Sequence, residues 1–411
     1  MTSIVADPRP RPSSDPAVNA PPIYLDNQST TRVDPRVLEA MLPYFTEHFG
    51  NPHSTSHAFG RLAADAIERA RGEVAALIHA DPREIVFTSG ATEANNLAIK
   101  GAAHFARAHP HSGQIRDHIV ALQTEHKCVL ESCAELEREG LAVTYLPVQP
   151  DGLVSLAALE GALSERTLLV SVMAAHNEIG VIQPLAEIGA LCRSRGVLFH
   201  TDAAQAFGKI PLDVEAMKVD LLSISGHKIY GPKGIGALYI RRRPRVRLLP
   251  LIDGGGQERG LRSGTLPTPL CVGLGRAAAI AAAEMAEEAE RLRRLRDSLL
   301  RNLARRVPRL RVTGDLEQRL PGSLNLSFAE IPALTLIAEV PSIAISTGSA
   351  CTSASVEPSY VLRALGLPDT LANASIRIGL GRFTTAAETD FAADALAVAA
   401  SRLTEQRGIP T

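Results

Sequence analysis

The chain of 411 residues contains no tryptophan, only five cysteines and no excess of charge of either sign. Five cysteines without a short, paired spacing argue against a disulfide framework or a zinc knuckle and favour a reducing compartment. The 43 basic and 44 acidic residues give a formal charge of −1, so no overall field attracts nucleic acid or a membrane surface. No apolar run reaches the length of a membrane span. We therefore expect a cytoplasmic protein that binds neither membranes nor nucleic acids directly.

Two segments have a biased composition. Residues 1–22 are rich in proline and small polar residues and lack the apolar core of a signal peptide, which predicts a flexible N-terminal tail. The second segment is a basic run near the middle of the chain. A solvated strand end is the favoured interpretation of this run, and a patch for an acidic partner is the alternative. Its members are Arg241, Arg242, Arg243, Arg245 and Arg247.

Between Ile23 and Arg241, short runs of β-branched residues alternate with helical periodicity. One apolar face predicts a helix over Arg61–Ile78, and Asp34 followed by Pro35 marks the start of another. This alternation is typical of an α/β fold with a largely parallel sheet covered by helices on both faces. The predicted strands are Glu84–Thr88, His118–Gln123, Val143–Val148, Thr167–Met173, Val197–Thr201, Leu221–Ser225 and Ile235–Ile240.

The pattern changes after the glycine-rich stretch Gly254–Gly264. A long helix, predicted over about Cys271–Arg306, leads into a portion in which short strands and helices mix. We therefore expect a large α/β domain over residues 38–285 and a smaller α+β domain formed by residues 23–37 and 286–411.

Ligands of an open α/β sheet bind at the carboxyl ends of its strands. Phe87–Thr92 runs from a predicted strand through a turn of small residues into a helix. Backbone N–H groups at that helix start, together with the Thr92 hydroxyl, can bind a phosphate. A turn of this kind is more often purely structural, so alone it identifies no site.

Two further strand ends carry charged residues. Asp202 closes an otherwise apolar strand and needs a partner, which a protonated heteroaromatic nitrogen, an arginine or a helix N-terminus can supply. Lys228 follows the strand Leu221–Ser225, where a lysine can lose its proton and form a Schiff base. Ser225 and His227 beside it offer two more phosphate donors. A lysine and a carboxylate in one sheet together favour a pyridoxal-phosphate site.

His126 and Cys351 are the remaining candidates for chemistry. His126 lies just beyond a predicted strand, where an imidazole can take up and return a proton near neutral pH; capping or packing is the alternative. Cys351 lies in a run of small residues typical of a mobile loop, expected over about residues 346–357, and an accessible thiolate there can act as a nucleophile. The other cysteines are predicted to be small buried hydrophobes: Cys128, Cys133, Cys192 and Cys271.

Taken together, these motifs resemble the cysteine desulfurase family of the IscS and NifS type, within the class V aminotransferases. The resemblance runs in matching order from Ile23 to about Leu403. It rests on the stretches FTSGATEANNLAIKG, QTEHKCVLESC, HTDAAQAFGKIPLD, SGHKIYGPKGIGALYIRRRPRVR, GGGQERGLRSGTLPTP and STGSACTSASVEPSYVLRALG. One local departure is His176-Asn177-Glu178, where relatives usually have Asn-Asn-Glu; the asparagine is retained.

The resemblance implies a pyridoxal-phosphate enzyme of fold type I, with the cofactor in the large domain, and a homodimer. It implies that Lys228 holds the cofactor as a Schiff base, that Asp202 pairs with the pyridine nitrogen and that Gln205 contacts the ring hydroxyl. His126 would stack on the ring and move protons. The remaining implied contacts are Ala91, Thr92, Ser225 and His227 with the phosphate, Thr265 with the phosphate of the other subunit, Asn177 beside the cofactor and substrate, and Arg377 with the substrate carboxylate.

The implied reaction converts L-cysteine to L-alanine and leaves a persulfide on Cys351, which supplies sulfur for iron–sulfur cluster assembly or tRNA thiolation. Relatives carry a docking tail after the last helix whereas this chain ends at Thr411, so an IscU-like scaffold and a Suf-type acceptor are both expected candidates. In relatives the mobile cysteine can share a [2Fe-2S] cluster, which makes Cys351 a candidate metal ligand. A selenocysteine lyase, another class V aminotransferase and a non-catalytic interaction protein are the alternatives.

Overall fold

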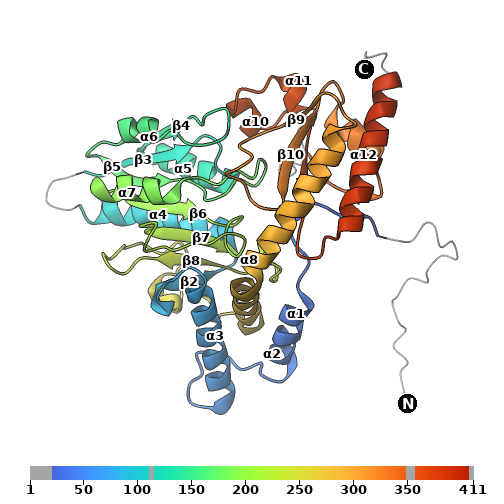
Figure 1. Ribbon diagram of the computed structural model, residues 1–411. Helices are drawn as coiled ribbons and strands as arrows, with labels where there is room; N and C mark the ends of the chain where they lie inside the picture. The colour runs from blue at the N-terminus through green and yellow to red at the C-terminus, as the bar shows by residue number, and fades with distance from the viewer. Residues whose placement is uncertain (1–20, 111–114, 349–356, 407–411) are drawn as a thin grey trace, which may run out of the picture.

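A mixed seven-stranded sheet lies at the centre of the larger of two units (Figure 1). The computed structural model describes residues 21–110, 115–348 and 357–406. The strands of the sheet are β2 (Ile85–Thr88), β3 (His118–Leu122), β4 (Ala142–Leu146), β5 (Thr167–Ser171), β6 (Leu198–Asp202), β7 (Leu221–Ser225) and β8 (Gly236–Ile240). They lie in the order β2-β8-β7-β6-β5-β3-β4, and only β8 runs antiparallel to its neighbours. The predicted α/β fold with a mostly parallel sheet is therefore confirmed.

Helices of the larger unit cover both faces of this sheet. They are α1 (Pro35–Met41), α2 (Pro43–Thr46), α3 (Ala58–Ala76), α4 (Ala91–Ala108), α5 (Lys127–Arg138), α6 (Leu156–Ala162), α7 (Leu185–Ser194), the first half of α8 (Thr268–Ala304) and the short 3₁₀ helices η1 (Pro82–Glu84), η2 (Gly226–Lys228) and η3 (Glu258–Gly260). Successive strand residues point to opposite faces. Phe87 and Phe199 thus share a core with α3, α7 and α8, whereas Val86 and Leu169 share one with α4 and α5.

The smaller unit has its own core. Its elements are β1 (Ile23–Tyr24), the second half of α8, β9 (Leu310–Val312), β10 (Ser323–Phe328), α9 (Ala333–Ala338), β11 (Ile343–Ala344), α10 (Tyr360–Ala364), α11 (Asp369–Ala372), β12 (Ser375–Gly379) and α12 (Ala386–Gln406). β10 is the centre of an antiparallel sheet with β12 and β9 on its two sides, and β1 pairs with β11 in parallel. The N-terminal segment is thus held by the smaller unit. The proposed boundaries at residues 37 and 285 stay a prediction, and residues 1–20 of the predicted tail lie outside the described part.

α8 joins the two units (Figure 1), packing first against α3 and then against α12. Its bounds and those of α3 agree with the predicted Cys271–Arg306 and Arg61–Ile78 to within three residues. Among the described helices α8 alone is long and apolar enough to cross a membrane, so the expectation that no apolar run reaches that length is wrong. Its buried residues belong to the cores of both units, and 44% of its apolar window is buried.

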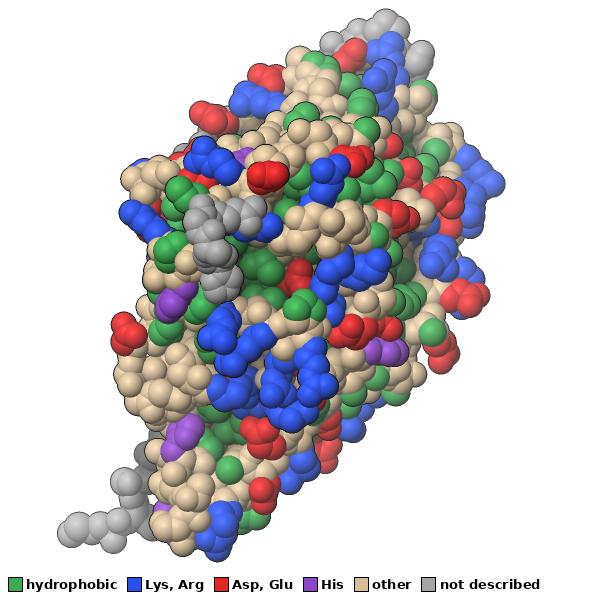
Figure 2. All heavy atoms as spheres, turned by 90° about the vertical axis from the view of Figure 1, so that its left-hand side faces the viewer, with side chains coloured by type: hydrophobic (Ala, Val, Ile, Leu, Met, Phe, Trp, Pro, Cys, Tyr) green, Lys and Arg blue, Asp and Glu red, His purple; other side chains and the backbone are tan. Residues whose placement is uncertain are grey.

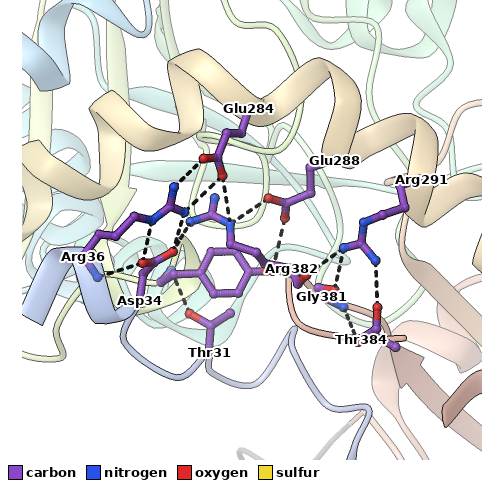
Figure 3. Close-up of polar contacts among 10 residues, drawn as sticks. Thr31, Asp34, Arg36, Glu284, Glu288, Arg291, Gly381, Arg382 and Thr384 are labelled. Carbon is purple, nitrogen blue, oxygen red and sulfur yellow. Dashed lines mark hydrogen bonds and ion pairs between the residues drawn. The ribbon is translucent and has the colours of Figure 1, made fainter. Parts of the chain in front are cut away.

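A network of ion pairs fastens α1 and the loop before α12 to α8 (Figure 3). Asp34, the N-cap that the sequence predicts for α1, accepts hydrogen bonds from Arg36 at 2.8 Å and from Arg382 at 2.9 Å. The bond from Arg36 is the main reason why the pKa of Asp34 lies well below its usual range, although burial opposes it. Arg382 also pairs with Glu288 at 2.8 Å. These pairs hold the smaller unit on the helix that also supports the larger sheet.

We expect Arg382→Leu to lower the free energy of unfolding by about 3 kcal/mol, because the carboxylates of Asp34 and Glu288 would stay buried with one cation fewer. Urea denaturation measures this change. Arg309→Leu is the matched control, since the pair between Arg309 and Glu330 is half exposed and contributes little. Equal losses in the two variants would refute a structural role for the network.

Burial of His200 in β6 makes the free energy of unfolding depend on pH. The ring is fully buried between Ser171 of β5 and Ser223 of β7, at 2.8 and 3.1 Å, and burial lowers its pKa to about 3. Between pH 6.5 and 3 the unfolded chain therefore binds one proton that the folded chain does not, so this residue makes stability fall as the pH falls through that window. We expect His200→Gln to reduce the slope of unfolding free energy against pH by up to about 1.4 kcal/mol per pH unit. Urea titrations between pH 4.5 and 7 test this, with the exposed His53→Gln as the control.

Candidate active site

A cavity of about 540 Å³ opens at the carboxyl ends of the parallel strands, between the two units. This is the edge at which ligands of an open α/β sheet bind. The cavity brings together ten of the residues singled out from the sequence: Ala91, Thr92, His126, Asn177, Asp202, Gln205, Ser225, His227, Lys228 and Arg377. Their assembly from segments almost 290 residues apart follows from the strand order and from the position of β12 over the sheet.

Asp202, the last residue of β6, is 6% exposed at the base of the cavity. Its carboxylate accepts hydrogen bonds from Asn95 Nδ2 at 2.7 Å and from the backbone N–H of Ala204 at 2.9 Å. Both donors are neutral, and no ion pair to Asp202 occurs among the described side chains. Of the partners that the sequence left open, an arginine is therefore wrong, and a cationic ligand group is the natural counter-charge.

Lys228 ends η2, directly after β7. Its Nζ donates to the backbone carbonyl oxygens of Gln28 and Ser29, at 2.6 Å each. Gln205 donates to the same Gln28 carbonyl at 2.8 Å and accepts from Lys209 Nζ at 3.1 Å. Burial, with the nearby charge of Lys228, lowers the pKa of Lys209 to about 7. The Lys228 amine and the Gln205 amide thus meet one short stretch of N-terminal backbone.

The turn from β2 into α4 has the features of a phosphate site. Gly90 caps α4 with φ 155° and ψ 179°, a conformation that only glycine adopts readily, and the first N–H groups of an 18-residue helix follow it. Thr92 and Ser225 line the cavity beside this turn. Burial lowers the pKa of His227 to about 4, so near neutral pH it can contact an anion as a hydrogen-bonding group and not as a cation. Lys233 also lines the cavity.

His126 is the N-cap of α5, as the alternative interpretation of the sequence allowed, and it also lines the cavity. Its Nδ1 accepts from the backbone N–H of Cys128 at 3.3 Å and lies 3.0 Å from Cys128 Sγ. Glu125 lies beneath it, fully buried, and burial raises the pKa of its carboxyl well above the usual value.

Arg377 of β12 reaches the cavity from the smaller unit. It donates to Asp26 Oδ1 at 2.8 Å, to Ser29 Oγ at 2.5 Å and to the carbonyl of Asn177 at 3.1 Å. Its buried Nε has no hydrogen-bond partner within the described part of the chain. The guanidinium is thus fixed in orientation and keeps one donor for a ligand.

Two predicted site residues are not placed in the cavity. Thr265 is exposed and does not line it; the sequence assigned Thr265 to the site of a second subunit, and that stays a prediction. Cys351 lies outside the described residues, although Gly348, three positions before it, lines the cavity. Within the described ranges no group of three His, Cys, Asp or Glu side chains could hold a metal ion.

Sequence reasoning missed five residues of the site. Gln28 and Ser29 lie outside the quoted motifs, whereas Lys209 and Asn95 lie inside HTDAAQAFGKIPLD and FTSGATEANNLAIKG but were given no role. Cys128 was predicted to be a small buried hydrophobe, which is wrong: it is half-buried, lines the cavity and contacts His126. For Cys133, Cys192 and Cys271 the same prediction is confirmed.

The basic run gives a mixed outcome. Arg241 is buried and pairs with Glu215 and Asp220, so for this residue the solvated interpretation is wrong. The other four arginines are exposed beside a second cavity of about 430 Å³. Figure 2 shows Lys and Arg side chains gathered on one face of the molecule.

Comparison with known proteins identifies the family. Residues 23–391 match the family described as Aminotransferase class-V. The chain belongs to that family. It is 56% identical over 393 residues to the cysteine desulfurase IscS of Rickettsia felis, covering 95% of this chain and 94% of the relative. It is 59% identical over 371 residues to the IscS of Rickettsia typhi, covering 90% and 89%.

Solved structures agree with this assignment. A NifS-like protein superposes with a TM-score of 0.84 at 39% identity and covers 93% of this chain and 99% of its own. A structure described as SspA in complex with cysteine has a TM-score of 0.76 at 39% identity, covering 88% and 100%. Within the class V aminotransferases, the chain is thus a cysteine desulfurase of the IscS and NifS type, the family that its motifs resemble.

The cofactor of this class V enzyme is pyridoxal 5′-phosphate, and the cavity fits it. The group has four polar parts: a ring nitrogen that can be protonated, a ring hydroxyl, an aldehyde and a phosphate. The cavity offers Asp202 without a cationic side-chain partner, Lys228 and the open turn at Gly90.

Proposed function

We propose that the cavity removes sulfur from L-cysteine through Lys228, His126 and Cys351, releasing L-alanine. The observation that carries this proposal is that Lys228, Asp202 and Arg377 line one cavity whose rim includes Gly348, close in sequence to Cys351. A selenocysteine lyase or another aminotransferase is less favoured, because the relatives described above are named cysteine desulfurases.

Pyridoxal phosphate, when bound, withdraws electrons from the substrate carbon that bears the amino group and so loosens the bonds around it. Asp202 would hold the ring nitrogen in its protonated form, and Gln205 would contact the ring hydroxyl. Lys228 would hold the cofactor covalently. The phosphate would lie at the start of α4, among Ala91, Thr92, Ser225 and His227, with Thr265 of a second subunit.

Arg377 would orient the substrate. Asp26 and Ser29 hold the guanidinium from one side, which leaves its unpaired Nε for a carboxylate. A fork fixed before binding loses little rotamer freedom when the substrate arrives. Asn177 lies beside it and would complete this contact.

Proton movement falls to two groups. Lys228, once released from the cofactor, can take the proton from the substrate carbon, since it lines the cavity and the backbone carbonyls of Gln28 and Ser29 hold its Nζ in place. His126 at the start of α5 can return a proton, because an imidazole exchanges protons near neutral pH.

The sulfur step uses Cys351. A bond forms between its sulfur and the substrate sulfur while the substrate's carbon–sulfur bond breaks, and the carbon takes up a proton. L-cysteine and a thiol thus give L-alanine and a persulfide, with no outside oxidant. The described ends of the segment that carries Cys351 both meet Glu178: Gly348 packs against it, and Ser359 donates to it at 2.7 Å. Gly348, three positions before Cys351, lines the cavity.

We expect Cys351→Ser to abolish alanine and sulfide formation from L-cysteine with a thiol acceptor, while the visible absorbance of the bound cofactor persists. Serine cannot form a persulfide, whereas the cofactor contacts stay in place. Alanine release and cofactor spectra measure the two effects, and Cys192→Ala, a buried cysteine in α7, is the matched control. Sulfide release that survives Cys351→Ser would contradict the assignment.

We also propose that the protein is a homodimer through the surface of α1, α2, α3 and the loop between α2 and α3. Large apolar side chains gather there in the single chain: Leu38, Leu42, Phe45, Phe49, Phe59 and Leu62, each about half exposed or more. An apolar cluster of this kind is typical of a protein interface. The need for Thr265 at a second site favours another copy of the chain as its partner.

Phe45→Asp combined with Phe49→Asp should convert the dimer into a monomer, because two charges would be buried in the interface. Light scattering after gel filtration measures the mass, and Leu334→Asp, at an exposed leucine on the smaller unit, is the control. A wild-type protein that is monomeric at micromolar concentration would exclude the proposed interface.

The persulfide sulfur would pass to an acceptor protein, either an IscU-like scaffold or a Suf-type acceptor, for iron–sulfur cluster assembly or tRNA thiolation. Cys351 could then also be a ligand of a [2Fe-2S] cluster shared with a scaffold. Co-purification of the tagged protein with its native partners tests which acceptor is used.

A further inference from the structure

Cys128 is a thiol in the cavity to which the proposed reaction gives no role. It lies in the first turn of α5, where it lines the cavity with His126 and Asp202. Cys133, further along the same helix, is fully buried in the core, where burial raises its pKa to about 12. The two thiols of α5 therefore lie in different surroundings, and only the first can act on the site.

The contacts of Cys128 form a chain between two cofactor-binding residues. Asn95 Nδ2 donates to Asp202 at 2.7 Å and to Cys128 Sγ at 3.1 Å, and that sulfur lies 3.0 Å from His126 Nδ1. Because Asn95 donates to the sulfur, the proton of the thiol is left for Nδ1. The order of the contacts is thus Asp202, Asn95, Cys128 and His126.

This chain determines which nitrogen of the neutral ring carries the proton. His126 Nδ1 already accepts from the backbone N–H of Cys128 at 3.3 Å. A ring nitrogen that accepts hydrogen bonds is unprotonated, so the proton of the neutral imidazole lies on Nε2. The thiol is a second donor to the same Nδ1 and favours the same tautomer.

We propose that Cys128 is a positioning residue of the desulfurase reaction, which holds His126 as the Nε2–H tautomer and links it through Asn95 to Asp202. The inference rests on the proposed place of His126 beside the reacting atoms. A neutral histidine that offers a hydrogen bond from Nε2 must carry its proton there, and a donor behind Nδ1 keeps it there.

Other titratable groups face His126, and the test must leave them in place. Glu125, His176 and Glu178 lie close enough to interact electrostatically with its ring, and Asp202 and Lys228 line the same cavity. Substitutions at Cys128 alter none of them, so changes in the variants report the thiol.

The experiment compares Cys128→Ala and Cys128→Val, which lack the donor, with Cys128→Ser, which keeps it. We expect kcat to fall roughly 3- to 10-fold in the first two, as for the loss of one hydrogen bond, with KM little changed. The acidic limb of the kcat/KM profile should move to higher pH, because the lost bond favoured the neutral ring. Cys128→Ser should stay within about 2-fold of wild type, and Cys133→Ala is the matched control on the same helix.

A second measurement detects the tautomer of His126 independently of enzyme activity. Proton–nitrogen correlation spectra of the histidine side chains, with His126 assigned through His126→Gln, report the tautomer whether or not the enzyme turns over. We expect the Nε2–H pattern in the wild type and in Cys128→Ser, and a mixture in Cys128→Ala and Cys128→Val. Unchanged tautomers and pH profiles in those two variants would show that Cys128 only packs. Inactivity of the wild type on L-cysteine would overturn the proposed reaction and leave the tautomer result standing.

Discussion

The N-terminal stretch from Asp26 to Thr31 is the constraint on which the site depends. It carries the backbone oxygens that receive the amines and amides of the cavity: the carbonyls of Gln28 and Ser29 bind Lys228, and that of Gln28 also binds Gln205. A half-buried ammonium group such as that of Lys228 needs compensation for the water it loses. Carbonyl dipoles provide it without a proton to exchange or a net charge.

The same stretch couples the two units. Asp26 accepts a hydrogen bond from Arg377 on β12 in the smaller unit. The hydroxyl oxygen of Thr31 accepts one from the backbone N–H of Tyr230, in the turn after η2 of the larger unit. The N-terminal stretch and β12 approach each other closely at Gly379, two residues after Arg377. A Cβ added at this position would lie 1.6 Å from Gln28 Oε1. Glycine at this position therefore sets the distance between the arginine and the backbone that holds the lysine. A shift of either unit would move both ends of the substrate site together.

The sequence predicts a site residue well when that residue lies at the end of a strand with a clear hydrophobic pattern. Asp202 ends the five-residue strand β6 and Lys228 follows the five-residue strand β7; parallel strands bring their ends to one edge, so both were identified. Gln28 lies near a two-residue strand that leaves no pattern, and its partners are about 180 to 200 positions away in the chain. The contact of Cys128 depends on the rotation of the first turn of α5. Neighbouring residues such as His126 and Cys128 share a helix start, and composition cannot say which of them faces the cavity.

The titratable groups around the cavity differ in whether burial keeps them neutral. Burial keeps His176 and His227 neutral, with pKa values of about 4. Burial also raises the pKa values of the Glu178 and Glu125 carboxyl groups, which favours their neutral forms. His176 and His227 are thus neutral near pH 7, whereas Lys209, with a pKa of about 7, titrates there. Under the proposed roles, Asp202 would meet a protonated ring nitrogen, and Arg377, which also pairs with Asp26, would meet a carboxylate. Neutral neighbours matter for proton transfer, because permanent charges around an imidazole would hold it in one protonation state. Positioning by neutral donors, such as the thiol of Cys128, selects a tautomer while leaving the ring able to gain and lose its proton.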